Sequence, residues 1–173
     1  TVAGNINSLK NAERLFDCGV DKLMIRSSLY NGTKTIEKIA NKFGNQAIIG
    51  CVDYIGYKEN ARCIYGKNNE IIDTKIVNLF KRIDDFGIGE ILLSSINKDG
   101  LMSGYDLDTY SLVKNYTKKP IILSGGCGSL EDAFLAFKSG VSAIAAGSLF
   151  YWVGESIISL KNYLEKNKIL VRM

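Results

Sequence analysis

Short apolar runs alternate with amphipathic segments along the whole chain. The runs are typical of strands buried on both faces, and the amphipathic segments are typical of helices packed on a sheet. Six strands are expected at 1–4, 22–27, 47–53, 90–96, 120–123 and 143–146. Six helices are expected at 8–18, 33–43, 73–86, 106–116, 129–139 and 154–165. This alternation, at a spacing of about 25 residues, predicts a parallel α/β fold in a single domain, 1–173.

Polar residues or glycines end nearly every expected strand. A (βα)8 barrel carries its chemistry at the carboxyl ends of its strands, so this pattern favours a barrel. A Rossmann-type sheet is the alternative, but no G-x-G-x-x-G motif opens the first helix. The long polar segment 54–72 has room for a small hairpin, and a connection of that length is usually functional or mobile.

The clearest pattern lies in 120–150, which contains a strand, a glycine turn, a helix, a second strand and a second glycine turn. Ser124-Gly125-Gly126-Cys127-Gly128 follows the first strand, and Gly147-Ser148 follows the second. Glycine lets a backbone pass so close to an anion that its N–H groups can donate to it. Two parallel strands that end this way predict a phosphate site, although glycine also marks ordinary strand–helix turns.

The same pattern occurs 121 residues earlier in the chain. Gly4 and Ser27 correspond to Gly125 and Ser148, and the helix positions between them also match. A shared helix pattern explains the matched apolar residues, but it does not explain the matched glycine and serine. We therefore expect two copies of one phosphate-binding βαβ unit, which suit a substrate with a phosphate at each end. The first copy is the weaker one, because Asn5 replaces its second glycine.

The composition excludes several classes of function. The net charge is +4 and the lysines are scattered, so we expect exposed helix faces and no nucleic-acid partner. Without a bilayer-spanning apolar run or a signal peptide, we expect no membrane partner and a cytoplasmic location. Histidine is absent, which removes the common catalytic triads and the H-E-x-x-H metal site. No metal and no cofactor are expected. The cysteines lack C-x-x-C spacing and are expected to be reduced thiols: Cys18, Cys51, Cys63 and Cys127.

A resemblance to the cyclase subunit of imidazole glycerol phosphate synthase, HisF, is carried by four segments. They are TVAGNI (1–6), AIIGCVD (47–53), EILLSSINKDGLMSGYD (90–106) and PIILSGGCGSLEDAFLAFKSGVSAIAAGSLF (120–150). The sibling isomerase of histidine biosynthesis shares the repeat but not the Ser-Gly-Tyr-Asp continuation. The resemblance covers the whole chain and implies an incomplete TIM-type (βα)8 barrel, with strands three to eight and their helices. The first two of the eight βα units are expected to be missing, so that this chain contains six βα units.

The family joins a ribulosyl-formimino nucleotide bisphosphate to ammonia from a glutaminase partner, and then forms imidazole glycerol phosphate and a carboxamide ribotide. The resemblance therefore implies a lyase or cyclase of histidine biosynthesis that works with a HisH-like glutaminase subunit. It places one of the two catalytic aspartates on the first strand, so the isolated chain is expected to be inactive.

The resemblance also implies roles for individual residues. Asp53 matches the family's catalytic aspartate, where ring closure needs a group that gives and takes protons; as an alternative, it only ends a strand at a turn. Asp99 and Gly100 match the substrate loop, although Asn97 and Leu101 replace the family's usual Asp and Thr. The implied phosphate-binding residues are Gly125, Gly126, Gly147 and Ser148 in the second copy, and Gly4, Asn5, Arg26 and Ser27 in the first.

Arg26 stands where the family has Asn, so either it grips the phosphate in a bidentate manner or it fills a volume. Lys22 and Glu90 match two members of the family's charged ammonia gate; alternatively they form an ordinary surface ion pair. Asp21 matches a partner-facing aspartate.

Two other functions remain open. The chain resembles a divergent paralogue that supplies ammonia to another synthase, such as one that amidates a surface sugar, which its departures from the family pattern favour. It also fits a non-catalytic module that only activates a glutaminase. The strands at 1–4 and 143–146 would have open edges in water, so either the chain is a piece of a longer protein or two copies associate through these edges.

Overall fold

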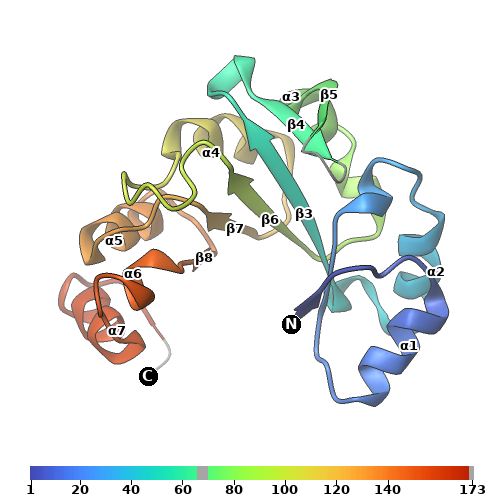
Figure 1. The fold of residues 1–173 in the computed structure, drawn as a ribbon, viewed down its shortest axis with the longest axis horizontal. Helices are drawn as coiled ribbons and strands as arrows, with labels where there is room; N and C mark the ends of the chain where they lie inside the picture. The colour runs from blue at the N-terminus through green and yellow to red at the C-terminus, as the bar shows by residue number, and fades with distance from the viewer. Residues whose placement is uncertain (66–69, 172–173) are drawn as a thin grey trace.

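One curved sheet organises the fold of the computed structural model, which describes residues 1–65 and 70–171. Its parallel strands follow the order β1-β2-β3-β6-β7-β8, and together they form an arc (Figure 1). This partial barrel confirms the expected incomplete TIM-type fold. The bounds of these strands are β1 Val2–Ala3, β2 Leu23–Ile25, β3 Ile48–Ile55, β6 Glu90–Ser95, β7 Ile121–Ser124 and β8 Ala143–Ala145.

The larger helices lie around the outside of the arc (Figure 1). Three predicted helix starts prove to be caps, because the side chains of Ser8, Asp106 and Ser129 each accept a hydrogen bond from a backbone N–H of the first turn. The helices are α1 Leu9–Asp17, α2 Lys34–Phe43, α3 Ile76–Phe80, α4 Leu107–Val113, α5 Leu130–Lys138, α6 Ser148–Tyr151 and α7 Ile157–Lys166.

The two faces of the sheet carry different residues because side chains alternate along each strand. The face under the helices joins the main core, for example through Ile48 and Val52 of β3, which are fully buried. The inner, concave face carries a smaller apolar cluster that contains Ile49, Cys51 and Leu92. Residues two apart from these, such as Asp53 and Glu90, therefore belong to the concave face as well.

The polar segment 54–72 contains antiparallel strands, as expected from the sequence for a small hairpin. The carboxyl-terminal end of β3, Tyr54 and Ile55, pairs antiparallel with β4 (Arg62–Tyr65). The strand β4 in turn pairs antiparallel with β5 (Glu70–Lys75). Residues 66–69 of the polar segment lie outside the described part.

The predicted helix at 73–86 is wrong at its start. The ladder between β4 and β5 extends to Lys75, so the helix α3 begins only at Ile76. It also ends early, at Phe80, and a separate 3₁₀ turn covers Ile83–Phe86 before Gly87. The predicted last helix likewise starts later than expected, because Ser156 and not Gly154 caps it.

The internal repeat is visible in the backbone. The bounds of α1 and α5 differ by the same 121 residues as the sequence match. Gly4 has φ +109° and its counterpart Gly125 has φ +94°, while Asn5 at φ +50° stands where Gly126 has φ +101°. Asparagine tolerates a positive φ better than most other residues, which explains how it replaces a glycine here.

The two ends of the sheet, β1 and β8, have no outer neighbour in the described part of the chain. Tyr151 and Trp152 follow β8 closely and are 87% and 80% exposed. Because open edges and exposed aromatic groups recruit other chains, we expect the 173-residue chain, purified on its own, to self-associate; in a longer protein, further residues would cover these edges instead. Light scattering checks this: the Trp152→Lys variant should shift the distribution towards monomer, whereas a stable wild-type monomer would contradict the prediction.

Candidate active site

The carboxyl ends of the parallel strands carry the predicted site residues to one edge of the sheet. Asp53 lies on β3, which stands between the two copies of the repeat in the strand order. From one end of the sheet to the other, the predicted residues are Gly4 and Asn5 after β1, Arg26 and Ser27 after β2, Asp53 on β3, Asp99 and Gly100 after β6, Gly125 and Gly126 after β7, and Gly147 and Ser148 after β8.

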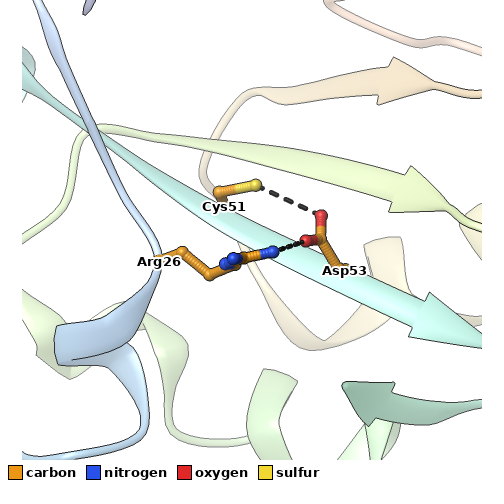
Figure 2. Close-up of polar contacts among 3 residues, drawn as sticks. All are labelled: Arg26, Cys51 and Asp53. Atoms are coloured by element: carbon orange, nitrogen blue, oxygen red, sulfur yellow. Dashed lines mark hydrogen bonds and ion pairs between the residues drawn. The ribbon is translucent and has the colours of Figure 1, made fainter. Parts of the chain in front are cut away.

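Asp53 is buried, with 8% of its surface exposed, and both of its carboxylate oxygens have partners (Figure 2). Arg26 Nη1 donates to Oδ2 at 2.5 Å, and the Cys51 thiol donates to Oδ1 at 3.4 Å. Cys51 lies two positions before Asp53 on the same strand, so its side chain shares the concave face. The Arg26 side chain is 41% exposed and approaches the carboxylate from the end of β2.

The electrostatics of this group keep two of its members, Arg26 and Cys51, in one protonation state. The hydrogen bond to Asp53 raises the pKa of Arg26, so the guanidinium remains charged. Burial raises the pKa of the Cys51 thiol well above its usual value, so Cys51 remains a proton donor and not a thiolate. The predicted catalytic carboxylate is therefore held between a cation and a neutral donor.

The second copy of the repeat forms a cavity of about 190 Å³, which we call the second cup. It brings the predicted substrate loop to the predicted phosphate site. The residues that line it are Asp99, Gly100, Ser124, Gly125, Gly126, Cys127, Ala145, Ala146, Gly147 and Ser148.

The Ser-Gly-Tyr-Asp stretch holds the second cup together. The Gly104 N–H donates to the Gly126 carbonyl at 2.8 Å, and the Tyr105 hydroxyl donates to the Ala145 carbonyl at 3.0 Å. A Cβ on Gly126 would lie 2.3 Å from the Gly104 carbonyl oxygen, so only glycine permits this approach. The Lys98 ammonium also binds this carbonyl oxygen, at 2.9 Å.

Asp106, the last residue of that stretch, connects α4 to the strand that carries Asp53. Its Oδ1 accepts from the Thr109 N–H at 3.1 Å, and its Oδ2 accepts from the Tyr54 hydroxyl at 2.9 Å. Burial raises the pKa of Tyr54, so the phenol keeps the proton that it donates. Asn97, one of the departures from the family pattern, accepts from the Gly56 N–H at 2.7 Å and so fixes the start of the hairpin loop.

The first copy of the repeat forms a larger cavity of about 360 Å³, which we call the first cup. All four phosphate-binding residues predicted in this copy line it, so the structure brings them together. The residues that line it are Ala3, Gly4, Asn5, Ile6, Met24, Ile25, Arg26, Ser27 and Cys51.

Lys22 and Glu90 lie at the opposite edge of the sheet, where the strands begin. Lys22 Nζ and Glu90 Oε1 are 2.5 Å apart, and their side chains are 35% and 26% exposed. The pair spans β3, because β2 and β6 are its two neighbours. Asp21 is exposed at the same edge.

Comparison with known proteins agrees with this geometry. The family described as histidine biosynthesis protein matches residues 1–154. The HisF subunit of imidazole glycerol phosphate synthase from Dictyoglomus thermophilum is 37% identical over 178 residues. This chain belongs to the HisF family. The match covers 100% of the chain and 69% of that relative.

Other HisF subunits are similar to a comparable degree. The one from Hydrogenobaculum sp. is 36% identical over 177 residues, and the one from Chlorobium phaeovibrioides is 35% identical over 176 residues. Each match covers 100% of this chain and 69% of the relative. The sequence similarity therefore extends through both copies of the repeat and the two parallel strands between them, β3 and β6.

Sequence reasoning missed several contacts of this HisF family member. The cysteine spacing indicates only that Cys51 is a reduced thiol, although the two-residue spacing between Cys51 and Asp53 places both side chains on one face of the strand. Lys98 and Tyr105 were part of the recognised motif, but no sequence signal indicated which carbonyls they would bind. Within the described residues, no cluster of three His, Cys, Asp or Glu could hold a metal, and no helix is long and apolar enough to cross a membrane.

Proposed function

We propose that the protein is the cyclase subunit of an imidazole glycerol phosphate synthase, a lyase of histidine biosynthesis. The observation that carries this proposal is the position of Asp53, a buried carboxyl group on β3, one of the two strands between the glycine-rich cups. A bisphosphate whose ends occupy the two cups would extend across β3 and β6 and bring its middle part to Asp53. The HisF relatives and the family match support the same reaction.

The groups at the carboxyl ends of the parallel strands would have separate roles. The second cup would bind one phosphate of the substrate through the backbone around Gly125, Gly126, Gly147 and Ser148. The first cup would bind the other phosphate, with Arg26 as its cationic group. Asp53 would give and accept protons during ring closure, and the loop with Asp99 and Gly100 would cover the substrate beside the second cup.

A HisH-like glutaminase would bind at the opposite edge, where the strands begin. The Lys22–Glu90 ion pair and the exposed Asp21 lie there, which supports a charged entrance beside a partner surface. Between this edge and Asp53, the concave face carries Ile49 and Leu92, whose apolar side chains suit the passage of neutral ammonia and not of ammonium.

One observation favours a second function, in which the protein supplies ammonia to a different synthase. Arg26 occupies one oxygen of the carboxylate that cyclisation would use. A paralogue that only transfers ammonia would not need this carboxylate to be free.

The test is an assay of the intact protein with the ribulosyl-formimino bisphosphate and an ammonium salt, and then with glutamine and a HisH-type glutaminase. We expect imidazole glycerol phosphate to form under both conditions. Glutaminase stimulation without cyclisation would contradict the proposal and favour ammonia supply or a purely activating module.

A further inference from the structure

Arg26 and Gly147 occupy equivalent positions in the two copies of the repeat. Arg26 has φ −111° and ψ −58°, and Gly147 has φ −110° and ψ −62°, so their backbones are nearly identical. In the second cup this position carries no side chain, and no atom lies within 4 Å of a Cβ placed there. In the first cup the same backbone carries a guanidinium that lines the cavity.

That guanidinium has two possible partners, one inside the molecule and one in the cavity. It is bound to Asp53 Oδ2 at 2.5 Å, yet 41% of its side chain is exposed and Gly4, Asn5 and Ser27 surround the same cavity. Arginine forms bidentate hydrogen bonds to carboxylates and to phosphates alike. A phosphate group that enters the first cup would therefore compete with Asp53 for the same donor.

We propose that Arg26 exchanges between Asp53 and a phosphate group of the substrate, so that Asp53 becomes available for proton transfer only when the first cup is filled. This inference rests on the proposed phosphate-binding role of the first cup. It adds a coupling between substrate binding and the readiness of the catalytic carboxyl group. Cys51 remains as a donor to the other oxygen of Asp53 after Arg26 leaves.

The second cup provides a control within the same molecule. Its equivalent position is Gly147, so phosphate can bind there without breaking an ion pair. In the wild-type protein, inorganic phosphate should therefore fill the second cup at lower concentration than the first. A change at Asp53 should alter the first cup alone.

The test is a double-mutant cycle read by NMR during titration with inorganic phosphate. The amide signals of Gly4 and Ser27 report on the first cup, and those of Gly147 and Ser148 report on the second. Asp53→Asn should increase phosphate affinity at the first cup about tenfold, because a neutral amide competes for the guanidinium much more weakly than a carboxylate does. In the Arg26→Ala background the same substitution should change the affinity less than about twofold, because a coupled pair does not act additively.

If Asp53→Asn still increased phosphate affinity tenfold in the Arg26→Ala background, the inference would be overturned. Asp53 would then weaken phosphate binding only by repelling the negative charge of the phosphate. If acetate at the same ionic strength shifted the amide signals of the first cup as much as phosphate does, the proposal that the first cup binds a phosphate group would be overturned. The wild-type protein gives an independent measurement if a variant fails to fold: the Arg26 side-chain signal, assigned with Arg26→Lys, should move as phosphate saturates the first cup. An unchanged signal at saturation would also overturn the exchange. Because these measurements follow binding, a failed exchange remains distinguishable from a failed cyclisation assay.

Discussion

Asp53→Asn is expected to lower the rate of cyclisation by the intact protein roughly 10²–10⁴-fold, which is the usual contribution of a positioned acid–base group. Asparagine has nearly the same shape as aspartate, and its side-chain oxygen can still accept from the Cys51 thiol, but the neutral amide holds Arg26 much more weakly than the carboxylate does. It cannot give or take a proton at this position. The loss should therefore appear in kcat, and KM should not rise, because the variant frees Arg26 for the substrate.

The matched control is Asp108→Asn, which removes the same charge from an exposed side chain in the first turn of α4. Turnover should stay close to the wild-type value in that variant. Steady-state kinetics on both proteins, with ammonium as the nitrogen source, measures the difference. Near-normal turnover by Asp53→Asn would mean that Asp53 only ends a strand and has no catalytic role.

Two substitutions in the second cup should separate folding from ligand binding. Gly126→Val forces a β-branched residue into φ +101° and places a Cβ 2.3 Å from the Gly104 carbonyl oxygen. Backbone strain and overpacking together should reduce the free energy of unfolding by about 2–5 kcal/mol. The melting temperature should fall on the order of 10 °C, and phosphate binding at this cup should be lost with the loop geometry.

Gly147→Ala is the matched variant in the same cup. The backbone at Gly147 has a negative φ, and a Cβ there meets no atom within 4 Å. We expect a change of less than about 0.5 kcal/mol in the free energy of unfolding, but weaker phosphate binding, because the methyl group enters the cavity. Calorimetry and a phosphate titration check both variants. Unchanged phosphate affinity in Gly147→Ala would remove this glycine from the site, and an unchanged melting temperature in Gly126→Val would contradict the packing argument.

Local sequence determined the elements that depend on near neighbours. The apolar runs predicted the parallel strands, and the amphipathic segments that start at Ser8, Asp106 and Ser129 predicted where three helices begin. The repeat was readable because positive φ angles at Gly4 and Gly125 leave a direct mark on residue choice. The resemblance to HisF then identified the strand ends where the site would lie.

Tertiary structure decided the remaining element bounds and the side-chain partners, because these depend on residues far away in the chain. The start of α3 could not be read locally, since pairing between β4 and β5 takes the backbone up to Lys75. The partner of Arg26 is 27 residues away on a neighbouring strand, and that of Lys22 is 68 residues away. Which side chains meet across a sheet depends on strand order and register, and a difference of one residue in register moves a side chain to the opposite face. The sequence therefore indicated which residues are chemically able to act, while the strand register determined that Arg26 and Asp53 share one ion pair.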